Sequence, residues 1–271
     1  MDGITVVERD DYSIFIIDKF SDEIKNAIRV NLSSICNGAA DAATGQMMYS
    51  YSNTLKEFIK RYDTKSDNQK KGMIGELLLH IILTELLNDR FVINSPFFNI
   101  EERSVKKGFD VVLNKTGTQE LWIAEVKSGE TSIGKTVSNK AVELINTAKN
   151  DLVNRLNGES VSLWRNAING ARIAMSENRD DKSAIISLLQ ECGNLASDNS
   201  VKSDDFNVIL VGTVFSSTCD QIVENDIASK QKRITYEKCF QKAYLIAIQK
   251  ETYQKVYNYI ESESKNEPDI T

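Results

Sequence analysis

The chain has 271 residues, of which 41% are hydrophobic and 27% charged, and its net charge is −6 at pH 7. These proportions are ordinary for a folded globular protein and argue against long disordered regions. No apolar run approaches the roughly 20 residues that cross a bilayer. The segment Met1 to Asp11 carries acidic residues where a secretory signal would be basic, so we expect a cytoplasmic protein that makes no membrane contact.

Side chains that bind zinc or act as general bases are scarce. The four cysteines form no CxxC pair, and His80 is the only histidine, so a zinc site built from Cys and His is disfavoured. Ser-His-Asp or Cys-His chemistry would depend on His80 alone. We interpret His80 as a buried or partly buried helix residue rather than as a base.

The first elements form an N-terminal extension, residues 1–69. We expect a short strand over 13–18 and a helix that begins at the N-cap Ser21 and ends at Cys36. A second helix is expected over 46–62. The polar segment 63–69 then separates the extension from the rest of the chain.

The main domain, residues 70–262, begins with a helix over 71–88, where apolar residues recur at helical spacing. Three strands are expected after it, over 91–95, 109–113 and 121–127. The last two are joined by Asn114-Lys115-Thr116-Gly117, which is typical of a hairpin turn.

Helices and two further strands complete the domain. The expected elements are helices over 140–156, 161–175 and 182–192, a strand over 206–215, a strand over 243–248 and a helix over 251–262, before a polar tail, 263–271. The run Val208-Ile209-Leu210-Val211 is typical of a strand buried on both faces. This order predicts an α/β fold, with a mixed central sheet flanked by helices.

The chemically informative residues lie on two of the expected strands. On a strand, residues i and i+2 share a face, so Glu125 and Lys127 point the same way and Val126 points the other way. Adjacent strands are about 4.8 Å apart, so Asp110 on the preceding strand can meet Glu125 side by side. The surrounding residues are apolar, and acidic side chains there require a partner or a cation.

A divalent cation would relieve the repulsion between these two carboxylates. All-oxygen ligands favour Mg²⁺ or Mn²⁺ over zinc. Such an ion activates a bound water and neutralises charge on a scissile phosphate, and Lys127 would orient or help deprotonate that water, or stabilise the phosphate oxygens. Two other Glu-x-Lys triplets, at Glu23 and Glu263, fall in an expected helix and in the polar tail, where this geometry is lost.

Glu76 is a further candidate, because it lies near the start of the otherwise apolar helix 71–88. The alternative is a glutamate stabilised by the helix dipole near an N-terminus. Gly72 and Gly75 would permit a close approach of this helix to the sheet or to a ligand.

The order Gly75-Glu76, Gly108-Phe109-Asp110, then Trp122-Ile123-Ala124-Glu125-Val126-Lys127-Ser128-Gly129 resembles the PD-(D/E)XK, or restriction-endonuclease-like, nuclease superfamily, and within it the HamA family of Hachiman anti-phage systems. No proline precedes Asp110. The resemblance implies an αβββαβ core with Glu76 on the first helix, Asp110 on the second strand and Glu125 with Lys127 on the third. It also implies a metal held by Asp110, Glu125 and the carbonyl of Val126.

The same resemblance implies that DNA is cut and that a superfamily 2 helicase, HamB, forms a heterodimer with the nuclease and restrains it until invading DNA is met. The acidic net charge is consistent with a partner that supplies the affinity for DNA. The basic clusters Lys70-Lys71, Lys106-Lys107 and Lys230 to Arg233 are interpreted as solvated surface rather than phosphate clamps.

Two alternatives remain at this stage. An autonomous restriction or repair endonuclease would be expected to carry a strong basic face, and none is evident. A non-catalytic nucleic-acid-binding adaptor would be expected to have lost at least one of Asp110, Glu125 and Lys127, and all three are present.

Overall fold

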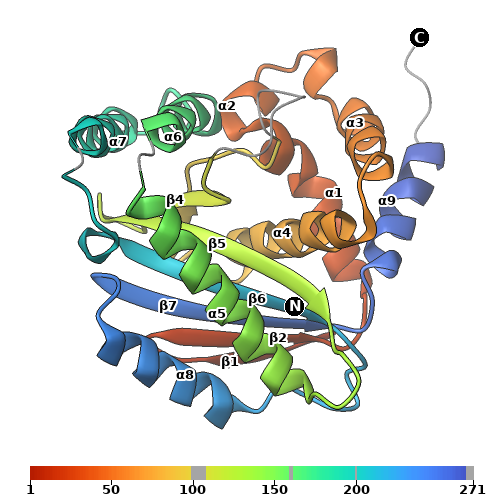
Figure 1. Cartoon of the computed structure of the whole chain (residues 1–271). Coiled ribbons are helices and arrows are strands. Elements are labelled where there is room, and N and C mark those ends of the chain that lie inside the picture. Colours follow the sequence, from red (N-terminus) through yellow and green to blue (C-terminus); the bar gives the residue numbers. More distant parts are fainter. Residues whose placement is uncertain (99–107, 159–160, 199, 267–271) are drawn as a thin grey trace.

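A computed structural model of the chain describes residues 1–98, 108–158, 161–198 and 200–266. Within these residues seven strands form one sheet in the order β1-β2-β7-β6-β5-β4-β3 (Figure 1). The strands are β1 (Ile4–Glu8), β2 (Tyr12–Ile17), β3 (Phe91–Ile93), β4 (Val111–Lys115), β5 (Leu121–Glu130), β6 (Asn207–Phe215) and β7 (Lys242–Lys250). Strands β5, β6, β7 and β2 pair in parallel and the other pairs are antiparallel, so the predicted α/β fold with a mixed sheet is confirmed.

Helices cover both faces of the sheet and bury two hydrophobic cores (Figure 1). One face is covered by α1 (Asp22–Asn37), α3 (Tyr51–Asp63), α4 (Asp67–Glu85) and α9 (Gln254–Asn266). The other is covered by α5 (Val137–Leu156), α6 (Val161–Ala174), α7 (Lys182–Ser197) and α8 (Glu224–Glu237). The short elements are α2 (Ala39–Ala42) and 3₁₀ turns at Met47–Tyr49 and Ser203–Asp205. No helix in the described part of the chain is long and apolar enough to cross a membrane.

The N-terminal extension contributes strands to the sheet. Strand β2 pairs in parallel with β7, and α1 and α3 share a buried core with α4. The domain boundary after residue 69 stays a prediction. The polar linker is shorter than expected, because α3 ends at Asp63 and α4 begins at Asp67, where the backbone N–H of Ser66 donates to Gln69 Oε1 (3.0 Å).

The segment from α4 to β6 has the element order that the sequence predicts. Helix α4 is followed by β3, β4 and β5, joined as antiparallel neighbours, and then by helices and the parallel strand β6. Every residue of β6 is buried, as its apolar run predicts for a central strand. This arrangement places β5 between β4 and β6, in the interior of the sheet.

The sequence did not predict β1 and α8. Strand β1 is a five-residue edge strand in which no residue is buried, although Ile4, Val6 and Val7 favour a strand. Helix α8 buries Lys230 and Gln231 between Ile227 and Ile234, so polar residues occupy positions where an apolar stripe is expected.

The interpretation of two basic clusters as solvated surface is wrong in part. The Lys71 side chain is buried and forms ion pairs with Asp67 and Glu130. Lys230 is buried and donates to Asn146 Oδ1 (2.7 Å). Both lysines therefore have structural partners, and Lys106-Lys107 lies outside the described residues.

Helix α4 crosses the sheet closely at Gly75. A Cβ atom at this position would lie 1.9 Å from Ser128 Oγ, 3.0 Å from Ser128 Cβ and 3.2 Å from Thr213 Cβ. The glycine therefore sets the distance between α4 and strands β5 and β6, as the sequence suggested. At Gly72, one turn earlier, nothing lies within 4 Å of such an atom.

These two glycines give a matched test of the helix–sheet contact. We expect Gly75→Ala to destabilise the fold by about 1–3 kcal/mol, because the added methyl group overpacks the contact with β5 and β6. Gly72→Ala, in the same helix, should stabilise the fold by up to about 1 kcal/mol, because alanine is the better helix former. Urea unfolding of both variants measures the difference, and equal effects would contradict this account.

Candidate active site

The β4–β5 register brings the predicted site residues together. Val111 on β4 is the partner of Ala124 on β5, so the next step of this antiparallel pair sets Asp110 opposite Glu125. Ala124 and Val126 pack into the core under α4, whereas Ile123 packs into the core under α5. Side chains alternate along a strand, so Glu125 and Lys127 face the α5 layer.

Asp110 lies directly before β4 and is bonded to β5. Its Oδ2 accepts a hydrogen bond from the backbone N–H of Val126 at 2.8 Å. In a strand the N–H and C=O of one residue point to the same neighbour, so the Val126 carbonyl also faces the side on which β4 begins. The Asp110 carboxylate and the Val126 carbonyl therefore lie on one side of β5.

Glu125 is a buried carboxylate between two cations. Its side chain is 2% exposed, and its two oxygens accept from Lys127 Nζ (3.0 Å) and Arg155 Nη1 (2.6 Å). Burial, followed by the charge of Asp110, raises the pKa of Glu125 to about 7, although Arg155 and Lys127 act in the opposite direction. The group thus binds a proton more readily than an ordinary glutamate, and a further cation near it would oppose this effect.

Lys127 connects the buried carboxylate to the surface. Its ammonium group also pairs with Asp151 of α5 (2.7 Å), whose side chain is 46% exposed. Burial lowers the pKa of Lys127, but Glu125, Asp151 and Asp110 outweigh burial, and the net shift is upward. Lys127 is therefore held as an ammonium ion.

The structure places Glu76 on α4, the helix that covers the face opposite to the one reached by Glu125 and Lys127. Glu76 is half-buried, and its charge contributes to raising the pKa of Cys36 on α1. Its role in the site stays a prediction. His80, one turn further along α4, is fully buried and meets Phe97 edge-to-face at 5.7 Å between ring centroids, so its interpretation as a buried helix residue is confirmed.

The available donors suit a hard cation rather than zinc. Asp110, Glu125 and the Val126 carbonyl offer only oxygen atoms, which Mg²⁺ and Mn²⁺ prefer. In the described part of the chain no group of three or more His, Cys, Asp and Glu residues could hold a metal ion. Mg²⁺ is commonly held by one or two carboxylates and keeps several waters, so two carboxylates and one carbonyl fit such an ion.

Arg155 and Asp151 are contacts of the site that the sequence did not predict. They stand four residues apart on α5, so both lie on the helix face that meets β5. Polar residues are frequent on the surface of any helix, so their identity carried no signal. Which polar residues of α5 meet the buried Glu125 depends on how the helix is rotated over the sheet.

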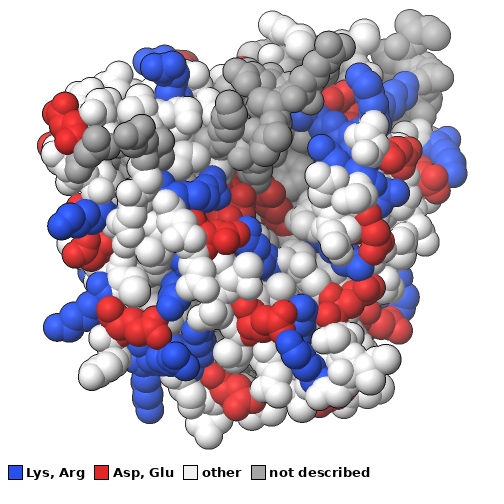
Figure 2. Space-filling view, viewed as in Figure 1, with Lys and Arg blue, Asp and Glu red and all other residues white. Residues whose placement is uncertain are grey.

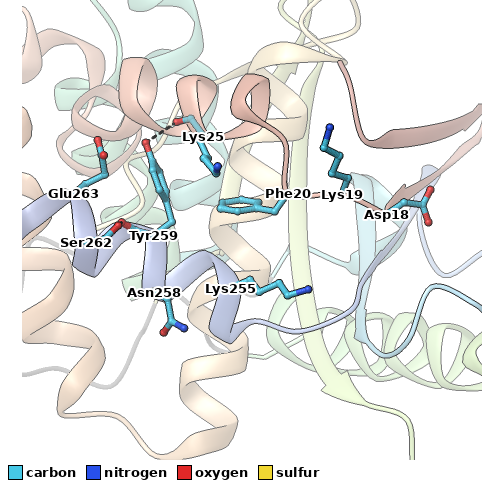
Figure 3. Close-up of a pocket in the computed structure, with 9 residues that line it drawn as sticks. All are labelled: Asp18, Lys19, Phe20, Lys25, Lys255, Asn258, Tyr259, Ser262 and Glu263. Atoms are coloured by element: carbon cyan, nitrogen blue, oxygen red, sulfur yellow. Dashed lines mark hydrogen bonds between the residues drawn. The ribbon is translucent and has the colours of Figure 1, made fainter.

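Surface charge around the site is mixed. Figure 2 shows basic and acidic side chains interspersed over this face, with acidic atoms at the floor of a hollow near its centre. A separate open groove of about 760 Å³ carries Lys19, Lys25 and Lys255 together with Asp18 and Glu263 (Figure 3). None of its lining residues belongs to β4, β5 or α5, so this groove is distinct from the candidate site.

The raised pKa of Glu125 predicts a specific pH dependence of stability. The folded chain holds this proton more tightly than the unfolded chain, so Glu125 stabilises the fold most at low pH, and this contribution is lost as pH rises from about 4.5 to about 7. We expect the stability of the wild type relative to Glu125→Gln to fall by roughly 1–3 kcal/mol over this range.

Urea unfolding at a series of pH values measures this difference. Glu120→Gln is the matched control on β5's flank: burial raises the pKa of Glu120, but Lys242 outweighs burial and the net shift is downward. The stability of the wild type relative to Glu120→Gln should therefore rise with pH, mainly below about pH 4.5, and change little above it. Parallel profiles for the wild type and Glu125→Gln would contradict the assignment.

Comparison with known proteins identifies the family. No curated protein matches the chain in a sequence search. A sequence model of the HamA family matches residues 4–263, which is nearly the whole chain. The match includes the N-terminal strands as well as β4, β5 and α5, so the sheet and the candidate site lie within the family's extent. The chain therefore belongs to the HamA family, which is associated with Hachiman defence against phage.

Proposed function

We propose that this chain is a metal-dependent DNA nuclease of the PD-(D/E)XK superfamily and the effector subunit of an anti-phage complex. The observation that carries the proposal is the meeting of Asp110, Glu125 and Lys127 around the start of β4. The element order from α4 to β6 and the membership of the HamA family support it.

Asp110, Glu125 and the carbonyl of Val126 would hold Mg²⁺ or Mn²⁺. When bound, such an ion lowers the pKa of a water and neutralises charge on the scissile phosphate. Lys127 is held as an ammonium ion, which favours a role in orienting the phosphate and stabilising its oxygens over a role as a base. Its side chain is 27% exposed, so a phosphate can reach it from solvent.

A partner would supply DNA affinity and control. The chain carries a net charge of −6, and its surface around the site mixes both signs (Figure 2). A polyanion is held mainly by clustered Lys and Arg, so the chain alone is poorly equipped to bind DNA. A HamB-like superfamily 2 helicase in a heterodimer fits this need, and would keep the nuclease inactive until it meets invading DNA.

The first test concerns the site. With plasmid DNA and Mg²⁺, we expect Lys127→Ala in the complex with the helicase to lose at least about 100-fold in cleavage rate, because charge developing on the phosphate loses its stabilising ammonium group. Lys242→Ala is the control, since Lys242 pairs with Glu120 at the surface and should keep the wild-type rate. Undiminished cleavage by Lys127→Ala would refute the site assignment.

The second test concerns the partner. We expect the purified chain to leave plasmid DNA intact with Mg²⁺, and the heterodimer with a HamB-like helicase to cut it when ATP is present. Sedimentation of the mixed proteins should show a one-to-one complex. If the chain alone cuts plasmid as fast as the complex, it is an autonomous endonuclease, and the regulated-effector proposal is wrong.

A further inference from the structure

Arg155 contacts both Glu125 on β5 and the residues that precede Asp110. It lies in the last turn of α5 and donates from Nη1 to Glu125 Oε2 (2.6 Å) on β5. Its Nη2 donates to the backbone carbonyl of Gly108, and its guanidinium group lies 5.7 Å from the centre of the Phe109 ring. One side chain therefore holds Glu125 and the two residues that precede Asp110.

Both carboxylate oxygens of Glu125 are bonded to cations of the chain. Oε1 accepts from Lys127 and Oε2 accepts from Arg155. A carboxylate that is 2% exposed requires such compensation, because an isolated charge is costly to bury. Arg155 thus fills, with a guanidinium group, the electrostatic role that a divalent ion between Asp110 and Glu125 would fill.

Arg155 and a divalent ion cannot both bind Glu125 Oε2 without repelling one another. An ion coordinated by Glu125 Oε2 would lie close to the positive guanidinium group of Arg155, which would repel it at short range. Lys127 is different, because Asp151 gives its ammonium group a second acceptor. Besides Glu125, Arg155 donates to the backbone carbonyl of Gly108, which is a neutral acceptor.

We propose that Arg155 is a positioning residue that holds Glu125 in the place of a divalent cation and competes with that cation for the carboxylate. This inference rests on the proposed metal-dependent function. Binding of the metal would then weaken the contact between Arg155 and Glu125 Oε2, because the two positive charges repel one another. If Arg155 had a purely structural role, its removal would lower the stability of the fold equally with and without metal.

The test is the binding of Mn²⁺ to the full chain, measured by isothermal titration calorimetry together with the melting temperature. For Arg155→Ala and Arg155→Gln we expect Mn²⁺ to bind more tightly than to the wild type, by roughly 5- to 150-fold, the usual size of coupling between two sites. Without metal both variants should melt at a lower temperature than the wild type, and Mn²⁺ should raise their melting temperatures more.

Arg155→Gln keeps a hydrogen-bond donor at this position and so guards against failure of the alanine variant to fold. Arg233→Ala is the control, since Arg233 pairs with Glu237 on α8, away from β5, and should bind Mn²⁺ as the wild type does. Equal or weaker binding by Arg155→Gln would overturn the competition and leave Arg155 a structural tie. Absence of Mn²⁺ binding from the wild type and from both Arg155 variants would instead refute the metal-dependent function.

Discussion

The burial of Glu125 beside Asp110 is the constraint on which the rest of the site depends. Two carboxylates brought together under a layer of helices repel one another, and burial favours the neutral form of Glu125. The chain meets this cost with Lys127 from the same strand and Arg155 from α5. The positive charges of Lys127 and Arg155 are therefore needed, because Glu125 is buried and Asp110 lies beside it.

The sheet sets this arrangement through backbone geometry. Strand β4 pairs with β5 from Val111 onward, so Asp110, the residue before Val111, lies opposite Glu125. On one face of the sheet, Gly75 lets α4 lie close to β5 and β6. On the other face, to which Glu125 and Lys127 point, α5 supplies the polar contacts. The charged groups thus lie on the α5 side, within an otherwise hydrophobic layer.

Strand alternation and the fixed spacing of adjacent strands were sufficient to predict the meeting of Asp110, Glu125 and Lys127. The turn lies later than predicted, because Asn114 and Lys115 belong to β4 and the connection to β5 runs over 116–120. Arg155 and Asp151 could not be predicted in this way. Their contacts depend on how α5 is rotated over the sheet, and the sequence of a helix specifies its apolar side more clearly than the partner of each polar residue. Helix α8 was not predicted because polar residues interrupt its apolar stripe, and the short edge strand β1 was not predicted although its β-branched residues favour a strand.

Val126 is restrained in two ways that leave it little freedom to vary. Its side chain fills the core under α4, and its N–H is committed to Asp110. A larger side chain at position 126 would push β5 away from α4, and a smaller one would leave a void into which the neighbouring residues could move. Either change would displace Glu125 and Lys127, which flank Val126. An outwardly conservative exchange at position 126 would thus be felt at Glu125 and Lys127, although the valine side chain itself points away from both.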